Sequence, residues 1–140
     1  MKKIILIITI VFSGLFTTNA QEAEKFSITV NITGLASNKG KVLLALYNKQ
    51  ENFLNKRFKG GMSKITDKKA TYVFEGVVKG EYAISFFHDE NNNNKMDTNF
   101  VGIPKEDYGC SNNATGFVGP PKYKDAKFQL LENKEISIEI

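Results

Sequence analysis

Short segments with the apolar patterns of β-strands recur along this chain, and they constrain its fold more than any other feature. Some alternate apolar and polar residues, which places the apolar side chains on one face of an extended strand; the others are nearly continuous apolar runs, as in fully buried strands. Turns rich in Gly and Asn separate them. The sequence therefore predicts an all-β fold, an antiparallel β-sandwich of about seven strands that is prealbumin- or immunoglobulin-like. Strands are expected at residues 26–32, 42–47, 72–74, 82–87, 126–130 and 136–140.

Two segments depart from the strand pattern. In residues 51–58 the larger side chains have the spacing of one face of a short helix, which Gly60 and Gly61 would end. Residues 98–125 have no strand pattern and form a long connection rich in Gly, Pro and Asn. Because disordered segments are poor in aromatic residues and this one contains several, we expect a packed surface loop that lies beside the loop beginning at Asp89.

The N-terminus has the parts of a secretory signal peptide. Lys2 and Lys3 form a basic start, an apolar run follows at residues 4–16, and small residues lead to Ala20. We expect cleavage after Ala20, which leaves residues 21–140 as a single exported domain in the periplasm, at the cell surface or outside the cell. No later run approaches the roughly 20 apolar residues of a membrane-spanning helix, so no transmembrane segment is predicted in the mature chain.

The composition of the mature chain limits its partners. Removal of Lys2 and Lys3 with the leader lowers the formal net charge from +4 to +2, and the remaining lysines are scattered, so no nucleic-acid groove is predicted. Cys110 is the only cysteine, which excludes an internal disulfide and makes a bound ion a candidate for added stability. The expected partners are another envelope protein or a small ligand, and the sequence leaves the oligomeric state open. A carrier role would use the apolar residues Phe117, Val118 and Tyr123 of the long loop.

Residues 89–97 follow a strand-like run and place side-chain oxygens at alternating positions. Calcium takes several oxygen ligands at about 2.3–2.6 Å, and a loop can supply them from its positions 1, 3, 5 and 9 together with the backbone carbonyl at position 7. The sequence therefore predicts a calcium site here. Its ligands are Asp89, Asn91, Asn93, the carbonyl of Lys95, and Asp97.

This loop is not an EF-hand. Position 6 is Asn94 where the EF-hand has Gly, although Asn is the next best residue for a left-handed backbone. Position 12 is Phe100, so the bidentate Glu is missing, and Glu106 and Asp107 are the nearby carboxylates that could replace it. The alternative is an Asn-rich turn without metal, because Asn and Asp side chains bond to their own backbone.

Several short motifs along the mature chain resemble those of a secreted bacterial family, domain of unknown function 2141. The most specific part is residues 88–93 followed by Gly102-Ile103-Pro104. The resemblance implies a small exported β-sandwich, similar in outline to transthyretin-like domains, with no assigned activity. The other matching motifs are Gly40-Lys41-Val42, Phe74-Glu75-Gly76, Gly80-Glu81-Tyr82-Ala83, Asp97, Tyr108-Gly109 and Ser111-Asn112-Asn113-Ala114.

The alternative class of function is an exported hydrolase or transferase that uses His88 with Cys110 or Ser111 as nucleophile. A lone His beside a turn is more often structural, a lone Cys is more often a buried apolar residue, and no G-x-S-x-G motif surrounds Ser111. One His and one Cys also make a poor zinc site. We therefore expect no enzyme but a secreted, calcium-stabilised binding or structural module of the bacterial envelope.

Overall fold

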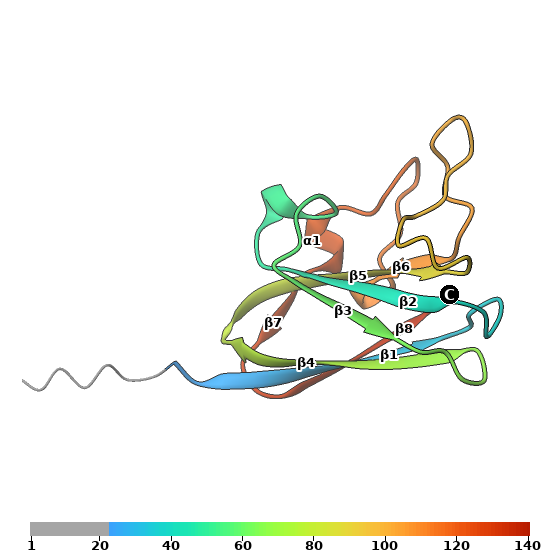
Figure 1. Ribbon diagram of the computed structural model, residues 1–140. Helices are drawn as coiled ribbons and strands as arrows, with labels where there is room; N and C mark the ends of the chain where they lie inside the picture. Colours follow the sequence, from blue (N-terminus) through green and yellow to red (C-terminus); the bar gives the residue numbers. More distant parts are fainter. Residues whose placement is uncertain (1–22) are drawn as a thin grey trace, which may run out of the picture.

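The computed structural model describes residues 23–140, and the expected signal peptide at residues 1–20 lies outside them. Within this described part of the chain, eight strands form two sheets that pack face to face (Figure 1). The predicted all-β sandwich is confirmed. The strands are β1 (Lys25–Thr33), β2 (Lys41–Tyr47), β3 (Lys59–Ser63), β4 (Lys69–Val78), β5 (Gly80–Asp89), β6 (Tyr108–Cys110), β7 (Phe128–Leu130) and β8 (Lys134–Glu139).

The smaller sheet has the strand order β4-β1-β8, and the larger has the order β3-β2-β5-β6. The short strands β6 and β7 pair with opposite ends of β5, at Ser85 to Phe87 and at Gly80 to Tyr82. The prediction of a wholly antiparallel sandwich is wrong at one pair, because β1 and β8 run parallel. A tight hairpin turn makes the two strands that it joins antiparallel. Strands β1 and β8 are the first and last in the chain, so no hairpin joins them and they are free to pair in parallel.

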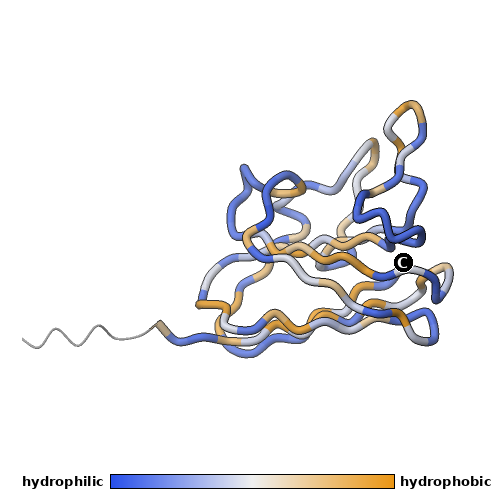
Figure 2. Tube along the Cα trace, viewed as in Figure 1, coloured by the Kyte–Doolittle hydropathy of each residue, from blue (hydrophilic) through white to orange (hydrophobic). Residues whose placement is uncertain are grey.

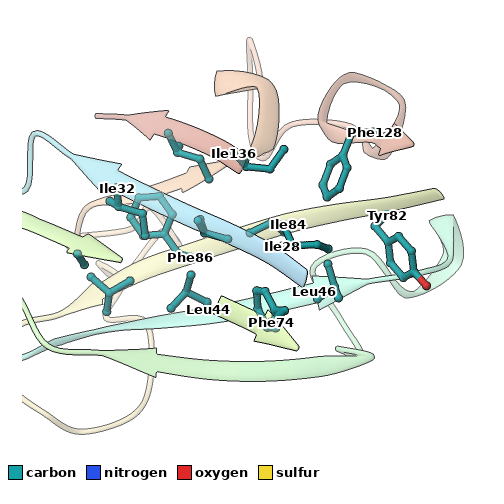
Figure 3. Close-up of a cluster of buried hydrophobic side chains, with 14 of the residues drawn as sticks. Ile28, Ile32, Leu44, Leu46, Phe74, Tyr82, Ile84, Phe86, Phe128 and Ile136 are labelled. Atoms are coloured by element: carbon teal, nitrogen blue, oxygen red, sulfur yellow. The ribbon is translucent and has the colours of Figure 1, made fainter. Parts of the chain in front are cut away.

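The alternating residues of the strands build the core between the sheets. Ile28, Val30 and Ile32 of β1 are buried, and so are the inward-facing residues of the strands opposite (Figure 3). Figure 2 shows the same division along the chain, with apolar strands and mostly polar connections. Each such Val, Leu, Ile or Phe contributes about 1.5–3 kcal/mol by leaving water. The core therefore holds β5 rigidly, and β5 carries the predicted metal loop at its end.

The helix expected over residues 51–58 is wrong. The structure has only a single 3₁₀ turn there, η1 (Gln50–Asn52), and Leu54 then takes a left-handed φ of 59°. Gly60 and Gly61, expected to end the helix, lie inside β3. A Cβ on Gly61 would come within 2.4 Å of the Tyr72 ring, so the glycine lets β3 pack against that ring. The α-helix of the structure is instead α1 (Tyr123–Ala126).

The long connection is more structured than its sequence predicts. Within residues 98–125 the chain forms β6, the 3₁₀ turn η2 (Ser111–Asn113) and the start of α1. Tyr123 is buried with Ala83, Cys110 and Ala126 in a second, smaller apolar cluster. This cluster attaches the end of the connection to the outer side of the larger sheet. Within the described residues, no helix has the length and apolar character needed to cross a membrane.

Candidate metal site

The predicted metal loop begins at the last residue of β5, which lies within the larger sheet. Asp89 is fully buried, and it pairs across the sheet with Lys41 of β2. The Lys41 Nζ lies 3.5 Å from Oδ2 of Asp89. Because an isolated buried carboxylate is costly, this cation and the hydrogen bonds described next are needed to hold Asp89 in place.

Backbone amides of the loop wrap around the Asp89 carboxylate. Its Oδ1 accepts a hydrogen bond from the Asn93 N–H at 3.0 Å, and its Oδ2 accepts one from the Asn94 N–H at 2.9 Å. Asn92 and Asn94 have left-handed φ angles of 60° and 61°. Asn tolerates this conformation better than most residues, and the two reversals curl the chain back over Asp89.

The alternate side chains of the loop converge. Asn91 Oδ1 accepts the Asn93 N–H at 3.0 Å, and Asn93 Oδ1 accepts the Lys95 N–H at 2.8 Å. The Nδ2 groups of Asn91 and Asn93 donate to the two oxygens of Asp97, at 2.5 and 2.9 Å. The structure therefore brings the predicted side chains Asp89, Asn91, Asn93 and Asp97 together, with the Lys95 peptide beside them.

A carboxylate from outside the loop joins its two ends. Glu106 Oε1 accepts the Glu90 N–H at 3.1 Å, and Glu106 Oε2 accepts the Asp97 N–H at 3.0 Å. The Asp107 carboxylate is directed elsewhere, because its Oδ2 accepts the Ala36 N–H at 3.0 Å. Of the two carboxylates that the sequence offered for position 12, only Glu106 thus lies at the loop. Its bracing role was missed, because no local spacing signals it.

The donor set suits a hard cation. It contains two carboxylates and the amide oxygens of Asn91 and Asn93, which are ligands of the type that calcium prefers, and the Lys95 carbonyl stays a predicted ligand. Each amide oxygen accepts one backbone hydrogen bond and keeps a second lone pair for a cation. Among residues 23–140 no three His, Cys, Asp or Glu side chains are grouped to hold a metal, so a cation site here would depend on the amide and carbonyl oxygens.

His88 is buried on the core side of β5. Its Nε2 donates to the Lys39 carbonyl at 2.7 Å, and its backbone N–H donates to the Asp107 carbonyl at 2.8 Å. Its Nδ1 has no hydrogen-bond partner among residues 23–140 and lies 3.8 Å from Glu90 Oε1. His88 therefore ties β5 to the turn before β2 and to the residues before β6.

The structure does not bring His88 to either candidate nucleophile. Cys110 pairs with Ser85 and lies with Ala83 on the outer side of the sheet, whereas His88 points to the core. Burial also raises the pKa of the Cys110 thiol to about 12. Catalysis by this pair has no geometric support.

Ser111 is fully buried, and its hydroxyl is taken up by the backbone. Its Oγ accepts the Ile84 N–H at 3.0 Å and donates to the Ala126 carbonyl at 2.5 Å. Ile84 is four residues before His88 on β5, roughly 13 Å along the strand. Ser111 thus fastens η2 and α1 to β5 and has no base beside it.

The three residues expected for a carrier role do not form one apolar surface. Tyr123 is buried in the smaller apolar cluster, so it is not available to a ligand. Phe117 and Val118 are fully or almost fully exposed at the tip of a loop. A different apolar surface, on the outer face of the larger sheet, is described below.

Together these features define a class of protein: a small β-sandwich with an Asp- and Asn-rich loop at the end of a central strand. The chain belongs to the bacterial family described as "Uncharacterized protein conserved in bacteria" (DUF2141), whose family model matches residues 30–139. The family resemblance of the sequence motifs is thereby confirmed, while the likeness to transthyretin-like domains stays a prediction. No curated protein and no solved structure matches the chain.

Proposed function

We propose that this protein is an exported module of the bacterial envelope with a binding or structural role, and that calcium bound by residues 89–97 stabilises its fold. One observation carries the calcium proposal. Four oxygen-bearing side chains converge in a loop that is anchored by the fully buried Asp89. The export proposal rests on the N-terminal sequence alone.

Calcium would enter by exchanging hydrogen bonds for coordination. The Nδ2 groups of Asn91 and Asn93 now neutralise part of the charge on Asp97. A cation in the same place takes over that role, so Asp97 and the amide oxygens become its ligands. Only two of the donors are carboxylates, and calcium sites of that kind in extracellular modules have a Kd of about 10⁻⁴–10⁻³ M.

The bound ion would stabilise the sandwich because of where the loop lies. Residues 89–97 join the end of β5 to the connection that returns through Glu106 to β6. Unfolding would separate these ligands and release the ion. Calcium at about tenfold above Kd then adds about 1.4 kcal/mol to the free energy of unfolding. For a domain of this size the melting temperature rises by roughly 5 °C.

The test compares thermal melting in millimolar calcium and in chelator for three proteins. Asp97→Asn removes one charged ligand with almost no change in size. Asp125→Asn is the matched control, because Asp125 is an exposed Asp outside the loop. Calcium should raise the melting temperature of the wild type and of Asp125→Asn but not of Asp97→Asn, and magnesium should substitute poorly because it prefers rigid octahedral geometry. Equal melting of the wild type with calcium and chelator, with no heat of calcium binding, would show a plain Asn-rich turn.

A further inference from the structure

A groove of about 1060 Å³ lies on the outer face of the larger sheet, away from the core. Its floor includes Leu43 and Ala45 of β2 and Phe87 of β5. Loops that rise on this side of the sheet form its walls (Figure 1), namely residues 54–57 on one side and parts of residues 94–104 and 119–121 on the other. The volume lies just above the range of about 300–1,000 Å³ typical of small-molecule sites.

The groove is open to solvent, and apolar side chains alternate with polar ones along its lining. Met62 and Tyr108, which line it, are 60% and 42% exposed. The loops beside it also carry exposed apolar tips, at Phe100 with Val101 and at Phe117 with Val118. These tips are the apolar stretches of the upper loops in Figure 2. Apolar surface gathered in this way marks a binding site more often than a plain solvated face.

One charged side chain, Arg57, lines the groove, and no carboxylate does. In the part of the chain that the structure describes, Arg57 forms no ion pair. A Cβ on Gly60 would lie 2.8 Å from Arg57 Nε, so the guanidinium stem rests on β3 where the glycine leaves room. The groove therefore presents a positive charge without a protein partner.

Two hydroxyl groups lie at the floor near this charge. The Tyr47 hydroxyl and Ser85 Oγ are 3.1 Å apart and hydrogen-bond to each other. Arg57, Tyr47 and Ser85 all line the groove, and burial raises the pKa of Tyr47, so its hydroxyl stays protonated near neutral pH. One cation and two hydroxyls in the same groove offer a polar anchor for one end of a ligand.

We propose that the groove binds a long-chain monocarboxylate of the fatty-acid class, with its carboxylate on Arg57 and its alkyl chain over Leu43, Phe87 and Tyr108. A guanidinium matches a carboxylate through two parallel hydrogen bonds. A phosphate ester would call for further cations or a ring of backbone N–H groups, and a sugar would call for carboxylates and amides along the floor. This inference goes beyond the calcium proposal, although Asn94 and Met96 of the metal loop form part of one wall of the groove.

The test is a calorimetric titration of the purified protein with dodecanoate and, separately, with dodecyltrimethylammonium, both below their micelle concentrations. Arg57→Gln removes the charge, and Lys56→Gln is the matched control, because Lys56 is the neighbouring cation and does not line the groove. Dodecanoate should bind the wild type and Lys56→Gln equally and should bind Arg57→Gln about tenfold to a hundredfold more weakly. The cationic probe should bind the wild type more weakly than dodecanoate does.

A second variant blocks the apolar floor without touching the core. Met62→Glu places a carboxylate at an exposed position of β3 and should abolish dodecanoate binding while the melting temperature stays within a few degrees. Titrations with calcium and with chelator separate this test from that of the metal loop. The proposal is overturned if the wild type does not bind dodecanoate, or if Arg57→Gln and Lys56→Gln bind it equally. It is also overturned if a peptide with a free apolar C-terminus, or a phosphatidylcholine vesicle, binds in preference to dodecanoate.

Discussion

Replacing Glu106 by Ala should loosen the metal loop and destabilise the whole domain even without calcium. The Glu106 carboxylate accepts two backbone hydrogen bonds, from Glu90 and Asp97, at the two ends of the loop. Hydrogen bonds to a charged group contribute about 1.5–3 kcal/mol each when well buried. Because Glu106 is only half-buried, we take about 1 kcal/mol for each, or about 2 kcal/mol in total. The melting temperature should then fall by roughly 6–10 °C.

The assay is urea unfolding and thermal melting in chelator, so that ion binding does not enter the comparison. Glu132→Ala is the control, because Glu132 is an exposed acidic residue in a turn far along the chain from the loop. Glu106→Gln keeps one good acceptor and should lose about half as much stability as Glu106→Ala. If Glu106→Ala unfolds within about 0.5 kcal/mol of Glu132→Ala, which is the scatter of ordinary surface changes, the bracing role of Glu106 is refuted.

The remaining predictions concern Ser111, Cys110 and export. Ser111→Ala leaves the Ile84 N–H and the Ala126 carbonyl buried without their partner, so it should cost about 2–4 kcal/mol in urea unfolding; a variant as stable as the wild type would remove its structural role. With a pKa of about 12, the Cys110 thiol should react slowly with a maleimide at pH 7.5, and His88→Ala should not change that rate unless it unfolds the protein. The unfolded Cys110 thiol has its ordinary pKa of 9.0, so it ionises at a lower pH than the folded thiol. Cys110 should therefore lower the free energy of unfolding as the pH rises from 9.0 to about 12, which is measured by comparing the pH dependence of melting with that of Cys110→Ala. Intact-mass analysis of protein recovered from the bacterial envelope should show that residues 1–20 are absent; a retained leader would contradict the expected cleavage.

The strands that sequence predicted best are those with a strict alternation. Ile28, Val30 and Ile32 are all buried. Alternate residues of a strand point to the same face, so an apolar residue at every second position predicts one buried face. The missed strands have no such pattern. The short β6 exists because its backbone pairs with β5, and β3 contains two glycines that sequence reasoning took for a helix end. Their strand conformation depends on backbone pairing with β2 and β5, and the Tyr72 ring leaves no room for a side chain at Gly61, which propensity alone does not reveal.

In the candidate metal site, too, some features could be predicted from the sequence and others could not. The convergence of Asn91, Asn93 and Asp97 follows from short-range hydrogen bonds between side chains and nearby residues, which depend on spacing and residue type. The contributions of Lys41 and Glu106 come from a neighbouring strand and from a returning loop, so spacing within residues 89–97 carries no trace of them. Local chemistry was therefore predictable, and the supports that hold it were not.

The two proposed sites share part of the chain, and this has a thermodynamic consequence. Asn94 and Met96 belong to the metal loop and also line the groove on the outer face of the larger sheet. The Asn94 N–H is held by Asp89, so an ion that fixes Asp89 and Asp97 also fixes this wall of the groove. A ligand that contacts an ordered wall loses less conformational entropy on binding than one that must order it. Any factor by which calcium strengthens ligand binding must then equal the factor by which the ligand strengthens calcium binding. Under the proposed export, such linkage would let a weak calcium site set the affinity of the groove according to the calcium outside the cell.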